Sequence, residues 1–126
     1  MRRIRNVYLI DTWSWIEYFL GNKITLPYIE GDEPLFTSII TLTELSRYCI
    51  WNYDEKTLDT ILMYIRTRST ILPLDEVIAL QAGTYIKKEV NGIADALILA
   101  TARLNNLKII TGDHHFSKIP GTIVLE

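Results

Sequence analysis

Five short apolar runs, separated by longer segments with helical periodicity, constrain the fold of this chain more than any other feature. The runs lie at residues 7–10, 35–40, 70–72, 108–111 and 122–125. Strands that are apolar on both faces are typical of buried parallel sheets, because helices cover both sides of such sheets. The alternation of strands and helices therefore predicts an α/β protein: a three-layer α/β/α domain around a mostly parallel five-stranded sheet.

Polar residues and glycines indicate where the intervening helices begin and end. Thr12 is expected to cap the first helix, with Gly21 at its carboxyl end. Asp54 and Asp75 are expected to begin two later helices. The clearest helix is predicted over residues 93–105, where apolar residues recur every three or four positions.

The composition is that of a globular protein, with 126 residues, of which 48% are hydrophobic and 22% charged. This length suits one core, so we expect a single domain over residues 1–126. A formal net charge of -2 excludes a general basic field for nucleic acid. The single cysteine, Cys49, excludes an internal disulfide and a multi-cysteine zinc site. We find no signal-peptide pattern and no apolar stretch of about 18 residues, so we expect a cytoplasmic protein without a membrane span.

Four acidic residues fall where a parallel sheet would bring them to one edge. Asp11 ends the first apolar run, Glu44 follows the second, Asp95 lies in the first turn of the clearest helix, and Asp113 follows the fourth run. Ligands of open parallel sheets bind at the carboxyl ends of the strands, so these carboxylates could meet. They could not all remain ionised there without a compensating cation. Oxygen ligands without a Cys or His cluster favour Mg²⁺ or Mn²⁺, the ions of metal-assisted phosphodiester hydrolysis.

Each carboxylate also has a purely structural interpretation. Glu44 matches a capping box with Thr41, and Asp95 would be favoured by the dipole of its helix in any case. Asp113 could serve as a turn or cap residue. Asp11 is the hardest to explain in this way, because a carboxylate that ends a buried strand is costly unless it is used or capped.

The motifs around these acids resemble the PIN domain, and in particular the VapC-like toxin ribonucleases of prokaryotic toxin–antitoxin pairs. They are Leu-Ile-Asp-Thr at 9–12, Thr-Glu-Leu at 43–45, Ala-Asp-Ala-Leu-Ile at 94–98, and Thr-Gly-Asp with a phenylalanine three residues on at 111–116. Together they span nearly the whole chain in the order and approximate spacing of the family.

The resemblance implies a Mg²⁺- or Mn²⁺-dependent endoribonuclease with sheet order 3-2-1-4-5. Asp11, Asp95 and Asp113 would bind the metal, and Glu44 would act through water. By the same resemblance, Thr111 and Thr12 would support the site by hydrogen bonding. The resemblance also implies RNA as substrate, an antitoxin protein as partner and a homodimer. His115 stands where many relatives carry a further acid, and this difference could alter the affinity for a second metal.

Basic and aromatic residues are the remaining candidates for contacts. Arg47 could hold a substrate phosphate or pair with Glu44, and Arg103 and His115 are further candidates for substrate binding. A basic cluster at positions 2, 3 and 5 would lie at the opposite end of the sheet from the acids. The aromatic-rich segment 13–19 is apolar all round, which indicates either burial or a groove for an antitoxin peptide.

We considered three other functions, of which one is disfavoured by a specific residue and two remain open. A haloacid-dehalogenase-like phosphotransferase needs a second aspartate two residues after the first, and Trp13 stands there. A PIN nuclease that processes RNA without being a toxin stays open, as does an inactive PIN-like binding module. Against the last, a module without catalysis has no need to keep four like charges together.

Overall fold

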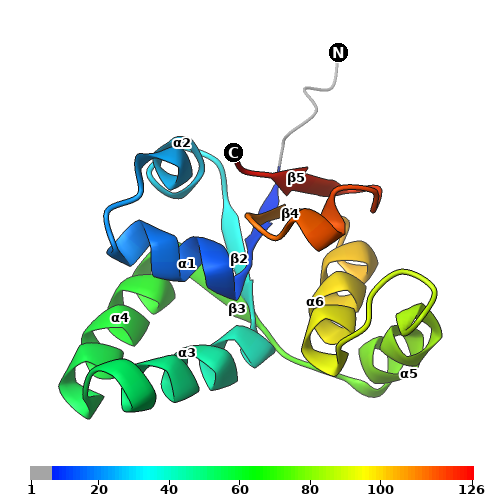
Figure 1. The fold of residues 1–126 in the computed structure, drawn as a ribbon, viewed down its shortest axis with the longest axis horizontal. Helices are drawn as coiled ribbons and strands as arrows, with labels where there is room; N and C mark the ends of the chain where they lie inside the picture. Colours follow the sequence, from blue (N-terminus) through cyan, green and yellow to red (C-terminus); the bar gives the residue numbers. More distant parts are fainter. Residues whose placement is uncertain (1–6) are drawn as a thin grey trace.

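The computed structural model describes residues 7–126 and contains five strands and a set of helices in alternation (Figure 1). The elements are β1 Tyr8–Ile10, α1 Thr12–Phe19, η1 Lys23–Thr25, α2 Leu26–Ile29, β2 Leu35–Ser38, α3 Ile39–Asn52, α4 Glu55–Arg68, β3 Ser69–Leu72, α5 Glu76–Tyr85, α6 Ile93–Leu104, β4 Lys108–Thr111, η2 His114–Phe116 and β5 Thr122–Val124. The predicted basic cluster at positions 2, 3 and 5 lies outside the described residues.

The sheet has the order β3-β2-β1-β4-β5, which confirms the predicted order. Every pairing between neighbouring strands is parallel, so the sheet is entirely rather than mostly parallel. Leu9 pairs with Ile109 and Ile10 with Ile110 in the register of β1 and β4. All four side chains are almost completely buried, as the apolar runs predicted.

Neighbouring residues of β1, β2, β4 and β5 belong to two different apolar cores, one on each face of the sheet. Leu9 and Ile109 pack with residues of α5 and α6. Ile10 and Ile110 pack with residues of α1, α3 and α4. Figure 1 shows the two groups of helices on opposite sides of the strands. The predicted three-layer α/β/α arrangement is confirmed, because side chains alternate across a strand and both faces are covered.

Two helix starts differ from the sequence predictions. Asp11, rather than Thr12, caps α1, and its side chain accepts a hydrogen bond from Ser14 N. The second strand ends at Ser38, which caps α3 and accepts a hydrogen bond from Ile40 N, so the predicted run 35–40 is too long. The capping box of Thr41 and Glu44 is therefore wrong, since α3 already begins at Ile39.

The other predicted boundaries agree well with the structure. Asp54 and Asp75 cap α4 and α5 through their side chains. Gly21 follows the last residues of α1 with a φ of 88°, a left-handed conformation that glycine adopts without strain. None of the helices within residues 7–126 has both the length and the apolar surface that a membrane crossing requires.

Candidate active site

The carboxyl ends of β1 and β4 place two aspartates at the same edge of the sheet. The backbone N–H of Asp11 donates to the carbonyl of Ile110 over 3.2 Å, which extends the pairing of the two strands to the acid itself. The side chain of Asp11 then turns to cap α1, and Asp113 caps η2 two residues beyond β4. Both positions follow from strands that end where a helical turn begins.

The other two carboxylates come from helices on opposite faces of the sheet. Glu44 lies in the second turn of α3, and Asp95 lies in the first turn of α6. These helices contact each other. All four acids line one open cavity with a volume of about 630 Å³. Its remaining lining consists of Thr12, Trp13, Ile16, Ile98, Gly112, His114 and His115.

Hydrogen bonds hold one oxygen of three of these carboxylates. Asp11 Oδ1 accepts from Ser14 N over 2.8 Å, and Glu44 Oε1 accepts from Thr12 Oγ1 over 2.6 Å. Asp113 Oδ1 accepts from the backbone N–H of His115 over 2.9 Å. At least one protein donor thus holds each of these three carboxylates in orientation.

The two threonines predicted to support the site both contact its acidic segments. Thr12 makes the bond to Glu44, and Thr41 Oγ1 lies 3.2 Å from the same hydroxyl oxygen. Thr111 is buried, and its Oγ1 accepts a hydrogen bond from Asp113 N over 3.0 Å. Because these bonds link separate elements, they stiffen the edge of the sheet around the cavity.

Burial and crowding of like charge disfavour ionisation in this cavity. Burial raises the pKa of Asp11 to about 6; the charge of Asp95 adds to this, and hydrogen bonds from Thr111 and Ser14 oppose it. Burial also raises the pKa of Asp95, and the charges of Asp113 and Glu44 raise it further. The described residues that line the cavity include no Lys or Arg to offset these four carboxylates. Perturbed carboxylates of this kind are a marker of functional sites.

The oxygen atoms of the four carboxylates are suitable ligands for a hard divalent cation. Four carboxylates without a lysine or arginine in the described cavity lining offer the oxygen ligands that Mg²⁺ and Mn²⁺ prefer, and a cation would favour the ionised forms that burial and like charge disfavour. Within residues 7–126, however, no group of three or more Asp, Glu, His or Cys side chains is arranged to hold a metal ion.

Gly112 and Trp13 shape the wall of the cavity next to Asp113. A Cβ atom at position 112 would overlap the indole ring of Trp13. Glycine is therefore needed for the ring to lie against the backbone that leads to Asp113. The contact with Trp13 therefore accounts for the glycine in the Thr-Gly-Asp sequence.

The three candidate substrate contacts lie in different places. The exposed side chain of His115 lines the cavity, and its Nδ1 lies 3.0 Å from Asp113 Oδ1. Arg47 lies outside the cavity, in a neighbouring hollow that also contains Glu44. Arg103 does not reach either space. It makes two hydrogen bonds to Glu89, of 2.7 and 2.8 Å, which favours a structural role.

Ser14 is a positioning residue that the sequence reasoning missed. It is fully buried, donates through Oγ to the carbonyl of Ile110 over 2.8 Å, and holds Asp11 through its backbone N–H. Its position three residues after an aspartate that could act as a cap was the available signal. Because the sequence analysis placed the cap at Thr12 instead of Asp11, it did not identify Ser14 as the residue that holds Asp11.

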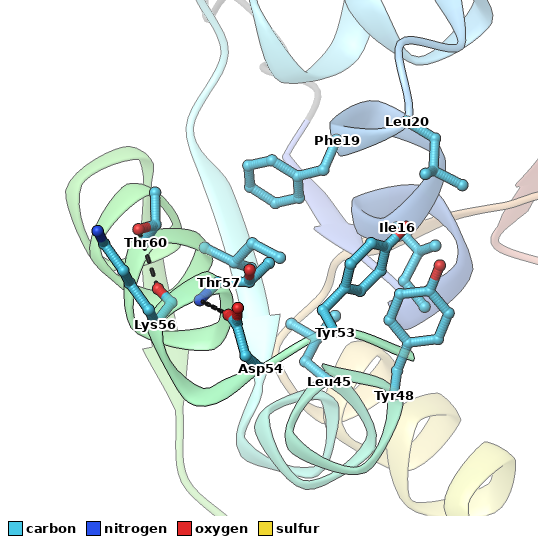
Figure 2. A pocket seen from close by; sticks show the side chains of 11 residues that line it. Ile16, Phe19, Leu20, Leu45, Tyr48, Tyr53, Asp54, Lys56, Thr57 and Thr60 are labelled. Carbon is cyan, nitrogen blue, oxygen red and sulfur yellow. Dashed lines mark hydrogen bonds between the residues drawn. The ribbon is translucent and has the colours of Figure 1, made fainter. Parts of the chain in front are cut away.

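An apolar groove lies beside the cavity, between α1, α3 and α4 (Figure 2). The groove has a volume of about 420 Å³. It is lined by Ile16, Phe19, Leu20, Leu45, Tyr48, Tyr53, Asp54, Lys56, Thr57, Thr60 and Ile61. Ile16 lines both the groove and the acidic cavity. The aromatic-rich segment 13–19 is therefore divided between core and surface, since Trp15 is fully buried while Ile16 and Phe19 face the groove.

Comparisons with known proteins agree with this architecture. The PIN domain family matches residues 8–122, which confirms the resemblance inferred from the motifs. A chain of a toxin–antitoxin complex from Klebsiella pneumoniae is 27% identical, with a TM-score of 0.78 over 93% of this chain and 96% of that one. A chain of FitAcB from Neisseria gonorrhoeae is 25% identical, with a TM-score of 0.68 over 94% and 96% of the two chains.

A third solved structure shows the same fold at lower identity. It is a chain of VapBC-1 from nontypeable Haemophilus influenzae, 22% identical, with a TM-score of 0.74 over 94% of this chain and 97% of that one. No curated protein matches the chain in sequence.

Proposed function

This chain belongs to the PIN-domain family, and from that premise we propose that it is a Mg²⁺- or Mn²⁺-dependent endoribonuclease, the toxin of a toxin–antitoxin pair. The observation that carries the proposal is the cavity in which four carboxylates from separate elements meet without a lysine or arginine in the lining described here. Such a site is electrostatically unfavourable on its own and becomes favourable with a cation.

Asp11, Asp95 and Asp113 are the residues that would hold the cation, with Glu44 acting through water. When bound, a divalent cation would acidify a water molecule and stabilise the negative charge that develops on the phosphate. Asp11 and Asp113 are oriented for this by Ser14 N and His115 N. Glu44 is oriented by Thr12 and is the group we propose to accept a proton from the attacking water.

The apolar groove is the surface that we propose for the antitoxin. Its aliphatic and aromatic lining suits an amphipathic helix or an extended segment with apolar side chains. Because Ile16 belongs to both the groove and the cavity, a peptide in the groove would end close to the acids. The similarity to a chain crystallised in a toxin–antitoxin complex supports this assignment.

A homodimer in the cytoplasm is the expected state of the free toxin, by resemblance to its family. Sedimentation of the purified chain without antitoxin tests the dimer. Induced expression in a bacterial host tests the toxin role: growth should stop with the native chain and continue with Asp95→Asn.

Cleavage of RNA by the purified chain is the direct test of the enzyme. We expect cleavage with Mg²⁺ or Mn²⁺, none with EDTA, and a loss of at least about 100-fold in Asp95→Asn and Asp113→Asn. Asp59→Asn is the matched control, because Asp59 is an exposed acid on α4 that is absent from the cavity lining. Cleavage that persists in EDTA or in both cavity variants would contradict the proposal.

A further inference from the structure

One face of α3 lines both the acidic cavity and a second open hollow with a volume of about 500 Å³. Beyond Glu44 this face carries Arg47, Tyr48, Trp51 and Asn52. Positions three, four and seven residues apart lie on one side of a helix, and seven residues correspond to about 10 Å along its axis. Thr12 and Glu44 line both spaces, so the hollow and the cavity are continuous.

Trp51 is exposed to an unusual degree for its size. Its side chain is 80% accessible, on the second-last residue of a fourteen-residue helix. Within residues 7–126, its indole makes no hydrogen bond and no contact with another aromatic ring. An indole left free in this way offers a flat surface on which a nucleic acid base can stack.

Arg47 is a free cation at the same place. The sequence left open whether it pairs with Glu44, and the structure answers this, because Glu44 is held by Thr12 instead. Across residues 7–126, the side chain of Arg47 forms neither an ion pair nor a hydrogen bond. Its guanidinium group therefore lies available beside the acidic cavity, where a phosphate next to the cleaved bond would need a positive charge.

We propose that this hollow binds an unpaired nucleotide adjacent to the bond that is cleaved, with its base stacked on Trp51 and its phosphate held by Arg47. This inference rests on the proposed nuclease function and adds to it a binding site for one nucleotide of the substrate, formed by two named side chains. A base within a duplex keeps both faces covered by its neighbours, so it cannot stack on the indole without being displaced.

The position of Trp51 favours RNA over a protein partner. Trp51 is absent from the lining of the apolar groove. Tyr48 lines the groove, where Figure 2 shows it, and also lines the hollow. The hollow combines the exposed Trp51 ring with the Arg47 cation and the Asn52 amide, and stacking surfaces beside positive charge are typical of sites that bind single strands. A peptide with an apolar face would gain more from the groove on the other side of Tyr48.

Binding measured without cleavage separates this inference from the enzyme activity. Fluorescence anisotropy in EDTA would compare a labelled single-stranded RNA of about ten nucleotides with the same strand annealed to its complement. The variants are Trp51→Ala, Trp51→Phe and Arg47→Ala. The matched control is Ile50→Ala, because Ile50 is 66% exposed on the same helix and does not line the hollow.

We expect the native chain to bind the single strand at least about tenfold more tightly than the duplex. Trp51→Ala should weaken binding of the single strand about tenfold, Trp51→Phe should restore most of it, and Ile50→Ala should leave it unchanged. Arg47→Ala should reduce the slope of log affinity against log salt by about 0.7, the value for one lost phosphate contact on a single strand.

Equal binding by Trp51→Ala and Ile50→Ala would overturn the inference. So would a change in sedimentation of Trp51→Ala with unchanged RNA binding, because the face would then be a contact between copies of the chain. Binding that depends on Trp51 in a chain that cleaves no RNA with Mg²⁺ or Mn²⁺ would support the hollow and refute the proposed catalysis. Cleavage that does not depend on Trp51 or Arg47 would support the proposed catalysis and refute the role of the hollow.

Discussion

Thr12 donates a hydrogen bond through its hydroxyl group to Glu44 Oε1 over 2.6 Å, and this bond joins the first turn of α1 to α3 across the edge of the sheet. The two residues are 32 positions apart in the chain. The bond fixes the rotamer of the one cavity carboxylate that comes from α3. Glu44 is held by Thr12 and not by Arg47, which is only three residues further along the same helix.

Removing the Thr12 hydroxyl should therefore loosen Glu44 without removing any carboxylate. Thr12→Val should lower the affinity for Mn²⁺ by about 10- to 100-fold, the usual effect of losing a group that orients a ligand. Thr12→Ser keeps the hydroxyl and should retain most of the affinity. Calorimetric titration with Mn²⁺ measures both variants, and equal affinities would show that the bond to Glu44 does not matter for the metal.

The pKa of Asp11 gives a stability that depends on pH in the absence of metal. Burial raises its pKa from 3.8 to about 6 in the folded chain, so between roughly pH 4 and pH 6 the folded state retains a proton that the unfolded state has lost. Stability must then fall as the pH rises through this window. The difference between 3.8 and 6 amounts to roughly 3 kcal/mol at neutral pH.

Asp11→Asn should remove this pH dependence. Asparagine caps helices as well as aspartate, so the bond from Ser14 N can be kept. Urea unfolding in EDTA should show that the variant gains stability relative to the native chain as the pH rises from 4 to 7. A constant difference across that range would mean that Asp11 ionises normally in the folded state.

Gly112→Ala should destabilise the wall of the cavity. The added methyl group would overlap the Trp13 ring, and overpacking of this kind costs about 1–3 kcal/mol. Gly83→Ala is the control with the opposite sign, because a Cβ at this position on α5 meets nothing and alanine favours a helix by about 0.5–1 kcal/mol. Thermal unfolding of the two variants should shift in opposite directions, and a shift in the same direction would contradict the packing argument.

Arg103 should matter for stability rather than for RNA. Its guanidinium group makes two hydrogen bonds to Glu89 and lies 4.8 Å from the centre of the Tyr85 ring, which ties α6 to the end of α5. Arg103→Ala should reduce stability by about 1 kcal/mol, because the pair is partly exposed. The salt dependence of RNA binding should not change. A reduced salt slope would restore Arg103 as a contact to phosphate.

Much of the fold could be predicted because it depends on local patterns. Runs such as 108–111 are apolar on both faces, and the caps Asp54 and Asp75 act on N–H groups three residues away. The start of α3 could not be predicted as easily, because Ile39 and Ile40 suit a strand as well as a helix. The hydrogen bond from Ile40 N to Ser38 Oγ decides between them.

The candidate site could be predicted only as a set of acids at one edge of the sheet. Strand ends fix where the backbone of Asp11 and Asp113 lies, but not which hydrogen bonds their side chains accept. The partners of Glu44 and Arg103 are 32 and 14 residues away, so they depend on how helices pack. Sequence spacing therefore left open whether Arg47 pairs with Glu44, and contacts across the fold answered it.

Calorimetric titration of the purified chain with Mn²⁺ tests most directly whether the four carboxylates form a cation site. We predict saturable binding that is at least about tenfold weaker in Asp11→Asn and Asp95→Asn and unchanged in the control Asp59→Asn. No binding by the native chain, or equal binding by all four proteins, would contradict a metal-dependent active site at this edge of the sheet.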